Sequence, residues 1–331
     1  MSRPVTVIAE AAQGFEGDVR LTRLLVRAAK AGRADMVKFQ LVYADELATP
    51  AYEHYELFKS LEMPDDDWFA VAQDAAQAGI GLAFDVFGER SLDLATRLGA
   101  GAVKLHATDF FNGPLVAAVL SRAPHVLLSL GGIEYPAIAG MLRGHDIAAD
   151  RLTLMFGFQG EPTTIEQNHL ARLAALHANF PGRRLGFMDH ADGASDEAGW
   201  LGVLALPFGV SVIEKHITLD RALELEDWVS ALDASAFARY VERIRTAEKA
   251  LGNPAFELSG PEREYGRRAV KSIVAAVPIA AGAPITAADL VALRAPSPAG
   301  CTPIRQADRV IGRRARRALA AGQPICGEDL E

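Results

Sequence analysis

Eight short apolar segments, each followed by an amphipathic stretch, set the pattern of residues 5–251. Buried strands are predicted at 5–11, 36–41, 81–87, 102–107, 125–132, 152–158, 184–191 and 210–218, with helical periodicity between them, as at 19–31, 65–78, 165–178 and 234–251. Nearly all-apolar strands that alternate with helices indicate parallel pairing with right-handed crossovers. Eight such units predict a closed (β/α)8 TIM barrel. An open doubly wound sheet is the alternative, but no G-x-G-x-x-G motif follows the first strand.

The pattern changes after Gly252. Residues 253–268 are polar and predicted to be an irregular linker, and 269–331 form short pieces divided by Gly and Pro. Two segments, 278–286 and 318–326, share an apolar-x-A-A-G-x-P-I pattern, and each precedes an Asp-Leu pair. The sequence therefore predicts a barrel domain at 1–252, a linker at 253–268 and a small, mostly β domain at 269–331.

Composition narrows the class of protein. Half of the 331 residues are hydrophobic, which argues against disorder, and a net charge of −8 argues against nucleic acid or an anionic membrane as partner. No signal peptide or membrane-spanning stretch is evident, so a soluble cytoplasmic protein is expected. The two cysteines, Cys301 and Cys326, are too few for a disulfide framework and are interpreted as packing or surface thiols.

Polar residues gather where the predicted strands end, the face on which TIM barrels carry their active sites. They are Glu10, Lys38, Gln40, Asp85, Lys104, Ser129, Gln159, Asp189, His190, Glu214 and His216. Histidines on two neighbouring strands could bind one divalent metal, or backbone carbonyls could satisfy them. Two lysines suit a phosphate or carboxylate, although a Lys38–Glu10 pair that closes the barrel mouth is a structural alternative.

Several of these segments carry a resemblance. Ile8–Glu10, Ala34–Gln40 (ADMVKFQ), Asp189-His190, and Ser211–His216 (SVIEKH) with Thr218–Asp220 resemble the sialic acid synthase family: N-acetylneuraminate synthase and its legionaminate and pseudaminate relatives. The tail from about Val270 resembles the antifreeze-like (SAF) domain that follows the barrel in that family.

The resemblance implies a reaction. Members of the sialic acid synthase family condense phosphoenolpyruvate with the aldehyde of an N-acylated amino sugar, and the products are a nonulosonic 2-keto acid and phosphate. They use a divalent metal, usually Mn²⁺, with Mg²⁺ or Co²⁺ being possible. It implies His190 and His216 as metal ligands, and Glu10 as the acidic residue of the first strand. Phosphoenolpyruvate would be held by Lys38, Lys104, Ser129 and Gln159. Acceptor contacts would come from Asp109, Asp227 and, across a domain-exchanged homodimer, Arg294. Gln40 and Thr108 complete the candidate substrate-binding residues.

The chain also departs from the family pattern. The turn at 14–17 lacks an imidazole, Met188 replaces a serine, Val86 and Ala107 stand where small hydroxyls are expected, and Glu161-Pro162 replaces Tyr-Pro. Two alternatives therefore stay open. One is a metal-dependent aldolase that uses a different donor or acceptor, and the other is a degenerate barrel that binds a sugar or a protein.

Overall fold

A computed structural model describes residues 4–145, 147–296 and 300–331. Two compact units form, Met1–Asn253 and Pro254–Glu331, and each is considered by itself. Among the described residues, none of the helices combines the length and hydrophobicity that crossing a membrane requires.

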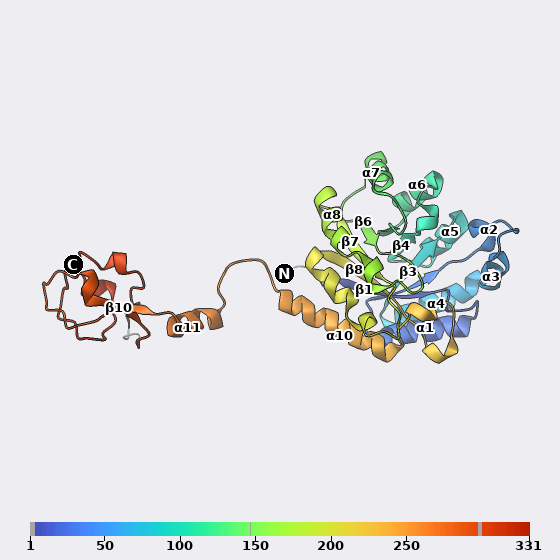
Figure 1. Cartoon of the computed structure of the whole chain (residues 1–331). Coiled ribbons are helices and arrows are strands. Elements are labelled where there is room, and N and C mark those ends of the chain that lie inside the picture. Colours follow the sequence, from blue (N-terminus) through green and yellow to red (C-terminus); the bar gives the residue numbers. More distant parts are fainter. Residues whose placement is uncertain (1–3, 146, 297–299) are drawn as a thin grey trace. The chain divides into compact units, whose positions relative to one another are not determined.

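The first unit is the predicted TIM barrel, because eight parallel strands close into one sheet surrounded by helices (Figure 1). The strands are β1 (Thr6–Ala12), β2 (Met36–Gln40), β3 (Gly81–Val86), β4 (Ala102–Leu105), β5 (Val126–Ser129), β6 (Leu152–Phe156), β7 (Arg184–Asp189) and β8 (Val210–His216). The helices are α1 (Val19–Ala31), α2 (Ala44–Leu47), α3 (Tyr55–Ser60), α4 (Asp65–Ala78), α5 (Glu89–Arg97), α6 (Gly113–Arg122), α7 (Tyr135–Gly144), α8 (Ala171–Asn179), α9 (Leu201–Ala205) and α10 (Ala234–Leu251). β1 pairs with both β2 and β8, so the open-sheet alternative is wrong.

Two apolar cores follow from the alternation of side chains along each strand. The larger lies between strands and helices, with Phe15, Phe39, Phe84 and Trp68 packed edge to face. The smaller lies inside the barrel and consists of Ile8, Ala83, Ala102, Leu127, Met155, Met188 and Val212.

The predicted helix at 165–178 is interrupted. Ile165–Asn168 forms a 3₁₀ turn, and α8 begins only at Ala171. His169 lies between them in the left-handed region, at φ 43° and ψ 44°, which a continuous α-helix excludes.

The second unit contains an antiparallel pair, β9 (Ser272–Ala275) and β10 (Leu290–Leu293). The two repeated segments face each other, since Ile279 and Leu319 exchange backbone hydrogen bonds in both directions, each 2.9 Å. The Asp of each Asp-Leu pair caps a 3₁₀ turn, Asp289 through Thr286 N and Asp329 through Cys326 N, both at 2.8 Å. The sequence repeat is therefore a structural repeat.

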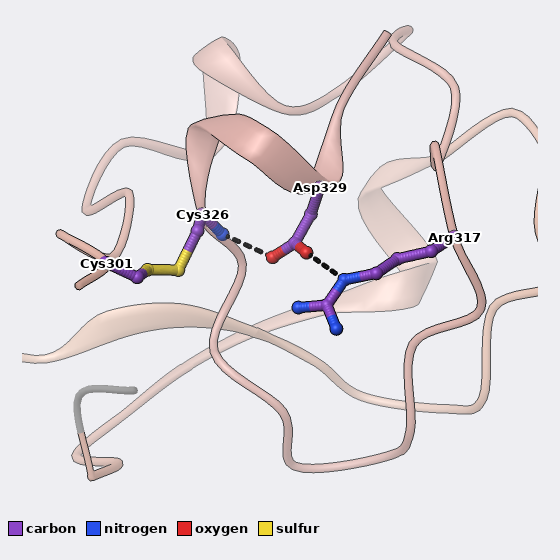
Figure 2. Close-up of a disulfide and its surroundings, with 4 residues drawn as sticks. All are labelled: Cys301, Arg317, Cys326 and Asp329. Carbon is purple, nitrogen blue, oxygen red and sulfur yellow. Dashed lines mark hydrogen bonds and ion pairs between the residues drawn. A yellow bond between two sulfur atoms is a disulfide. The ribbon is translucent and has the colours of Figure 1, made fainter. Parts of the chain in front are cut away.

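Two expectations for this unit were wrong. The segment predicted as irregular contains α11 (Gly260–Ala269), which a reciprocal Ser259–Glu262 capping box begins. The cysteines form a Cys301–Cys326 disulfide, beside the Asp329 carboxylate that Cys326 and Arg317 hold (Figure 2). The pairing arises because an antiparallel bridge between Pro303 and Cys326 brings the Cα atoms to 6.1 Å, within the usual disulfide range.

Candidate active site

A network of buried charges lies at the carboxyl end of the barrel strands, at the mouth. Lys38 is fully buried, and its ammonium forms ion pairs with Glu10 Oε2 and Asp85 Oδ2, and with Glu214 Oε2 at 3.7 Å. The structural alternative, a Lys38–Glu10 pair, is thus present, but it is one part of a larger network. Burial lowers the pKa of Lys38, and the carboxylates of Asp85 and Glu214 oppose that shift.

Lys104 forms the second half of the network. Its Nζ lies 2.6 Å from Glu214 Oε1. Burial lowers the pKa of Lys104, but Glu214 and Asp85 outweigh it, and the net shift is upward. Burial likewise raises the pKa of Glu214, but Lys104 and Lys38 bring it down to about 2. Two lysines and three acidic residues therefore meet with almost no exposure to bulk water.

His190 and His216 lie side by side at the same end of the barrel. Their ring centroids are 4.9 Å apart, and Nδ1 of each ring is buried without a hydrogen-bond partner among the residues that the structure describes. Burial first, and then nearby positive charge, lowers the pKa of His190 to about 3 and that of His216 well below its ordinary value. Both rings are neutral at physiological pH. Neutral imidazole is the form that binds a metal.

His190 and His216 would supply some, but not all, of the ligands of a divalent metal. Paired neutral rings with unpartnered nitrogens are suitable ligands. The described residues contain no group of three or more His, Cys, Asp or Glu that could hold a metal ion. The chain would therefore supply two ligands, and water or substrate would supply the others, as in open catalytic sites rather than closed structural ones.

Polar side chains of two predicted donor-binding residues meet beside the network. Ser129 Oγ donates to Gln159 Oε1 at 3.2 Å, and Gln159 Nε2 lies 3.1 Å from His106 Nε2. Burial lowers the pKa of His106 to about 4, so this ring is also neutral. His106 joins the site because it follows β4 directly.

Two further candidate substrate-binding residues meet at one loop: Gln40 is the last residue of β2, and Asp227 lies in the loop after β8. Gln40 Oε1 accepts from Gln13 Nε2 at 2.8 Å, and Asp227 Oδ2 accepts from Gln13 N at 3.2 Å, so one residue links the two. Glu161 hydrogen-bonds to Asp227. Partial burial and the Asp227 charge raise the pKa of Glu161 to about 8. Glu161 therefore keeps its proton near neutral pH, beside the Asp227 side chain.

Thr108 and Asp109 belong to the turn after β4. Thr108 Oγ1 donates to Asp109 Oδ2 at 3.1 Å, and Asn112 Nδ2 donates to Asp109 Oδ1 at 2.9 Å. The Asp109 carboxylate is thus occupied by local contacts, which a bound sugar would have to replace.

Asp189 was wrongly grouped with the residues that face the mouth. Its carboxylate points away from the barrel interior toward α10, where Tyr240 OH donates to Oδ2 at 3.1 Å and Lys215 Nζ lies 3.0 Å from Oδ1. The cause is strand alternation, since Met188 and His190 face inward and the residue between them faces outward.

Arg294 follows β10 in the second unit. Its Nε donates to Ala269 O at 2.9 Å, and it lines a hollow with Glu264, Arg267 and Arg268. Its predicted contact with a sugar stays a prediction.

Sequence reasoning placed Asp85 and Glu214 at the strand ends but gave neither a role among the site residues. The signal that could have found them is cross-strand register, because Asp85 lies opposite Lys104, and Glu214 is two residues before His216 on the same face. Thr218 Oγ1 is a further buried atom with no partner among the described residues.

A cavity of about 640 Å³ lies between α7, α8 and the loops after β5 and β6. Its inner wall includes Leu130 and Gly131, which adjoin the Ser129–Gln159 contact.

Fold and site together define a TIM-barrel enzyme with two buried lysines and two adjacent imidazoles at its catalytic face, followed by a small β domain. The chain belongs to the NeuB family, whose model matches residues 25–255, and residues 270–331 match the SAF domain. It is an enzyme, a synthase of the sialic acid synthase type.

Relatives extend over nearly the whole chain. The N,N'-diacetyllegionaminic acid synthase of Legionella pneumophila is 28% identical, covering 98% of this chain and 94% of its own length. The pseudaminic acid synthase of Helicobacter pylori is 24% identical, with coverages of 100% and 99%. The crystal structure of a putative spore coat polysaccharide biosynthesis protein E from Chromobacterium violaceum has the same fold, with a TM-score of 0.81, 22% identity, and coverages of 99% and 100%.

Proposed function

We propose that the enzyme condenses phosphoenolpyruvate with the open-chain aldehyde of an N-acylated amino sugar, with uptake of water, to give a nonulosonic 2-keto acid and phosphate. The observation that carries the proposal is the meeting of Lys38, Lys104, His190 and His216 at one end of the barrel in a chain whose relatives are named as sialic-acid-type synthases.

The buried lysines would hold the donor. Lys38 and Lys104 come from strands two positions apart and are both linked to Glu214, so their charges converge on one small region. A phosphate or carboxylate in that region would meet ammonium groups in a medium where Coulomb attraction is strong. Ser129 and Gln159 add a hydroxyl and an amide beside them. Such positioning brings the reacting carbons together at little entropic cost.

His190 and His216 would hold a divalent metal, most suitably Mn²⁺. When bound, the metal supplies a Lewis acid for the aldehyde oxygen, on which negative charge develops as the carbon–carbon bond forms. Glu10 positions Lys38, because its Oε2 pairs with that ammonium and its Oε1 accepts from Ala12 N at 2.7 Å. Asp227 and Gln40 would contact the acceptor at the rim.

The experiment is an assay of phosphate release from phosphoenolpyruvate with a panel of N-acylated hexosamines and Mn²⁺. Release should require the donor, an acceptor and the metal together, and mass spectrometry should show a product three carbons longer than the acceptor. No release with any acceptor or metal, from a protein that binds metal tightly, would refute the proposal.

The charge at the mouth favours one second candidate. Three carboxylates surround two lysines, which suits a donor with less negative charge than phosphoenolpyruvate. A metal-dependent aldolase reaction of pyruvate meets that condition. It would form a product from pyruvate and the acceptor without phosphate.

The proposed assembly is a cytoplasmic, domain-exchanged homodimer, supported by the family resemblance of Arg294. An Arg294→Ala substitution should raise KM for the acceptor and leave KM for the donor unchanged. Light scattering of the full chain gives the oligomeric state.

A further inference from the structure

The three carboxylates of the mouth are held to different degrees. Both oxygens of Glu10 are used, one by Lys38 and one by the backbone N–H of Ala12. Glu214 is fastened to Lys104 at 2.6 Å through Oε1, and its Oε2, which has no hydrogen bond within the described residues, lies 3.7 Å from Lys38 Nζ, so Glu214 has two ion-pair partners. Asp85 pairs through Oδ2 with Lys38, and its Oδ1 is buried with no hydrogen-bond partner in the described part of the chain. Asp85 is thus the carboxylate with the fewest contacts to lose.

Such an arrangement has a cost. A buried acceptor left without a hydrogen bond costs about 1–3 kcal/mol, and folded proteins rarely keep one without a reason. Asp85 is 1% exposed, so bulk water does not supply the missing donor. This cost has a reason if a bound ligand completes the network of charges and hydrogen bonds around Asp85.

The charges of the network give Asp85 a specific effect. Lys38 and Lys104 contribute two positive charges, and Glu10, Asp85 and Glu214 contribute three negative ones, for a total of −1 with neutral imidazoles. An anion entering this region must compete for Lys38 with a carboxylate that is already bound to it. Without Asp85 the total would be zero, and Lys38 would keep Glu10 as its partner.

We propose that Asp85 is the specificity-determining residue of the donor subsite, acting as a built-in counter-ion that an anionic donor displaces from Lys38. This inference rests on the proposed function for the identity of the donor. A simple anion such as inorganic phosphate gains too little to displace Asp85. A donor that carries both a carboxylate and a phosphate can engage Lys38 and Lys104 together. Asp85 therefore weakens binding of every anion but penalises simple ones most, and it favours departure of the phosphate product.

The test is the Asp85→Asn variant of the full chain, with inorganic phosphate and phosphoenolpyruvate as probes. Isothermal titration without acceptor, at fixed Mn²⁺, should show phosphate binding about tenfold or more tighter than to the wild type, which corresponds to about 1.4 kcal/mol. In the turnover assay, KM for phosphoenolpyruvate should fall, competitive inhibition by phosphate should strengthen by a larger factor, and kcat should not rise.

Asp189→Asn is the matched control. Asp189 is also a buried strand-end carboxylate paired with a buried lysine, but it faces α10 rather than the mouth. This variant should lose stability and leave phosphate affinity unchanged. If Asp85→Asn does not fold, Asp85→Ser provides the same loss of charge in a smaller side chain.

Folded Asp85 variants with unchanged or weaker phosphate affinity would overturn the inference. Equal tightening in Asp189→Asn would also overturn it, because the effect would not belong to the mouth. The titration with phosphate does not depend on turnover. A wild-type enzyme that fails to release phosphate from phosphoenolpyruvate would refute the proposed function while the role of Asp85 in excluding anions is still measured.

Discussion

Two buried clusters in the barrel both pair lysines with carboxylates, but they differ in hydrogen bonding. In one cluster the polar atoms have partners, and in the other several do not. On the outer side of the strands, Asp189 accepts from Lys215, from Tyr240 and from Ala191 N, and Lys215 also donates to Ala191 O. At the mouth, Asp85 Oδ1, Glu214 Oε2 and the Nδ1 atoms of His190 and His216 have no hydrogen-bond partner within the described residues.

The difference separates structure from function. Buried polar groups normally find partners, and the outer cluster follows that rule completely. The mouth leaves these four polar atoms without a hydrogen bond from the described part of the chain. A cluster that is complete in the folded chain is expected to stabilise it, and one that is incomplete is expected to bind something.

The largest expected effect on activity comes from the two histidines of the mouth. His216→Ala, and separately His190→Ala, should lower kcat/KM for phosphate release by about a hundredfold or more, because the proposed metal would lose one of two protein ligands. Stability should change less, since neither Nδ1 forms a hydrogen bond with any described residue. Steady-state kinetics and thermal unfolding measure the two effects. Full activity in either variant would contradict the metal assignment.

The next largest effect should come from the complete cluster. Lys215→Met leaves the Asp189 carboxylate buried without its cation, which typically costs about 3–5 kcal/mol. Chemical unfolding should show this loss, while kcat/KM per folded molecule stays at the wild-type value. A variant with wild-type stability and reduced activity would reverse the roles assigned to the two clusters.

A smaller change in the same cluster tests one hydrogen bond. Tyr240→Phe removes the hydroxyl that donates to Asp189 Oδ2 at 3.1 Å. The expected loss is about 1–3 kcal/mol, because a buried charged acceptor loses one partner. Unfolding in urea gives the value. Phe237, another buried aromatic residue on α10, offers a packing control as Phe237→Leu.

The smallest effect concerns pH and the rim of the mouth. Partial burial and Asp227 raise the pKa of Glu161 to about 8, from an ordinary 4.5. Because the folded state holds this proton more tightly, the contribution of Glu161 to stability is greatest below pH 4.5 and is lost as pH rises through about 8. In the Glu161→Gln variant, the midpoint of thermal unfolding should depend less on pH between pH 4.5 and about 8. Parallel curves for variant and wild type would show that the pKa of Glu161 is not raised in the folded state.

The strands were predictable because their residues are almost all apolar, and all eight lie within the predicted segments or within one residue of them. The break at His169 was not, because a single left-handed residue leaves no mark on hydrophobic periodicity. The disulfide was missed because two cysteines 25 residues apart meet only through backbone pairing in the second unit.

The candidate site was predictable to the level of strand ends. The inward placement of Lys38, Lys104, His190 and His216 follows from alternation along each strand. The same rule, applied to Asp189, would have excluded it from the mouth. The competition between Asp85 and Glu10 for Lys38 needs the register between β1, β2 and β3, which no local pattern contains.

Closure of the barrel has a consequence for how the chain matures during synthesis. Thr6 pairs with Val212, so β1 keeps one edge unpaired until roughly 200 further residues have been made. At ordinary rates of translation this takes about ten to forty seconds. Glu10 and Asp85, the partners of Lys38, are synthesised early. Glu214, the partner of Lys104, is synthesised 110 residues after Lys104. The last strand to join therefore closes the barrel and completes the charge balance of the catalytic mouth in a single step.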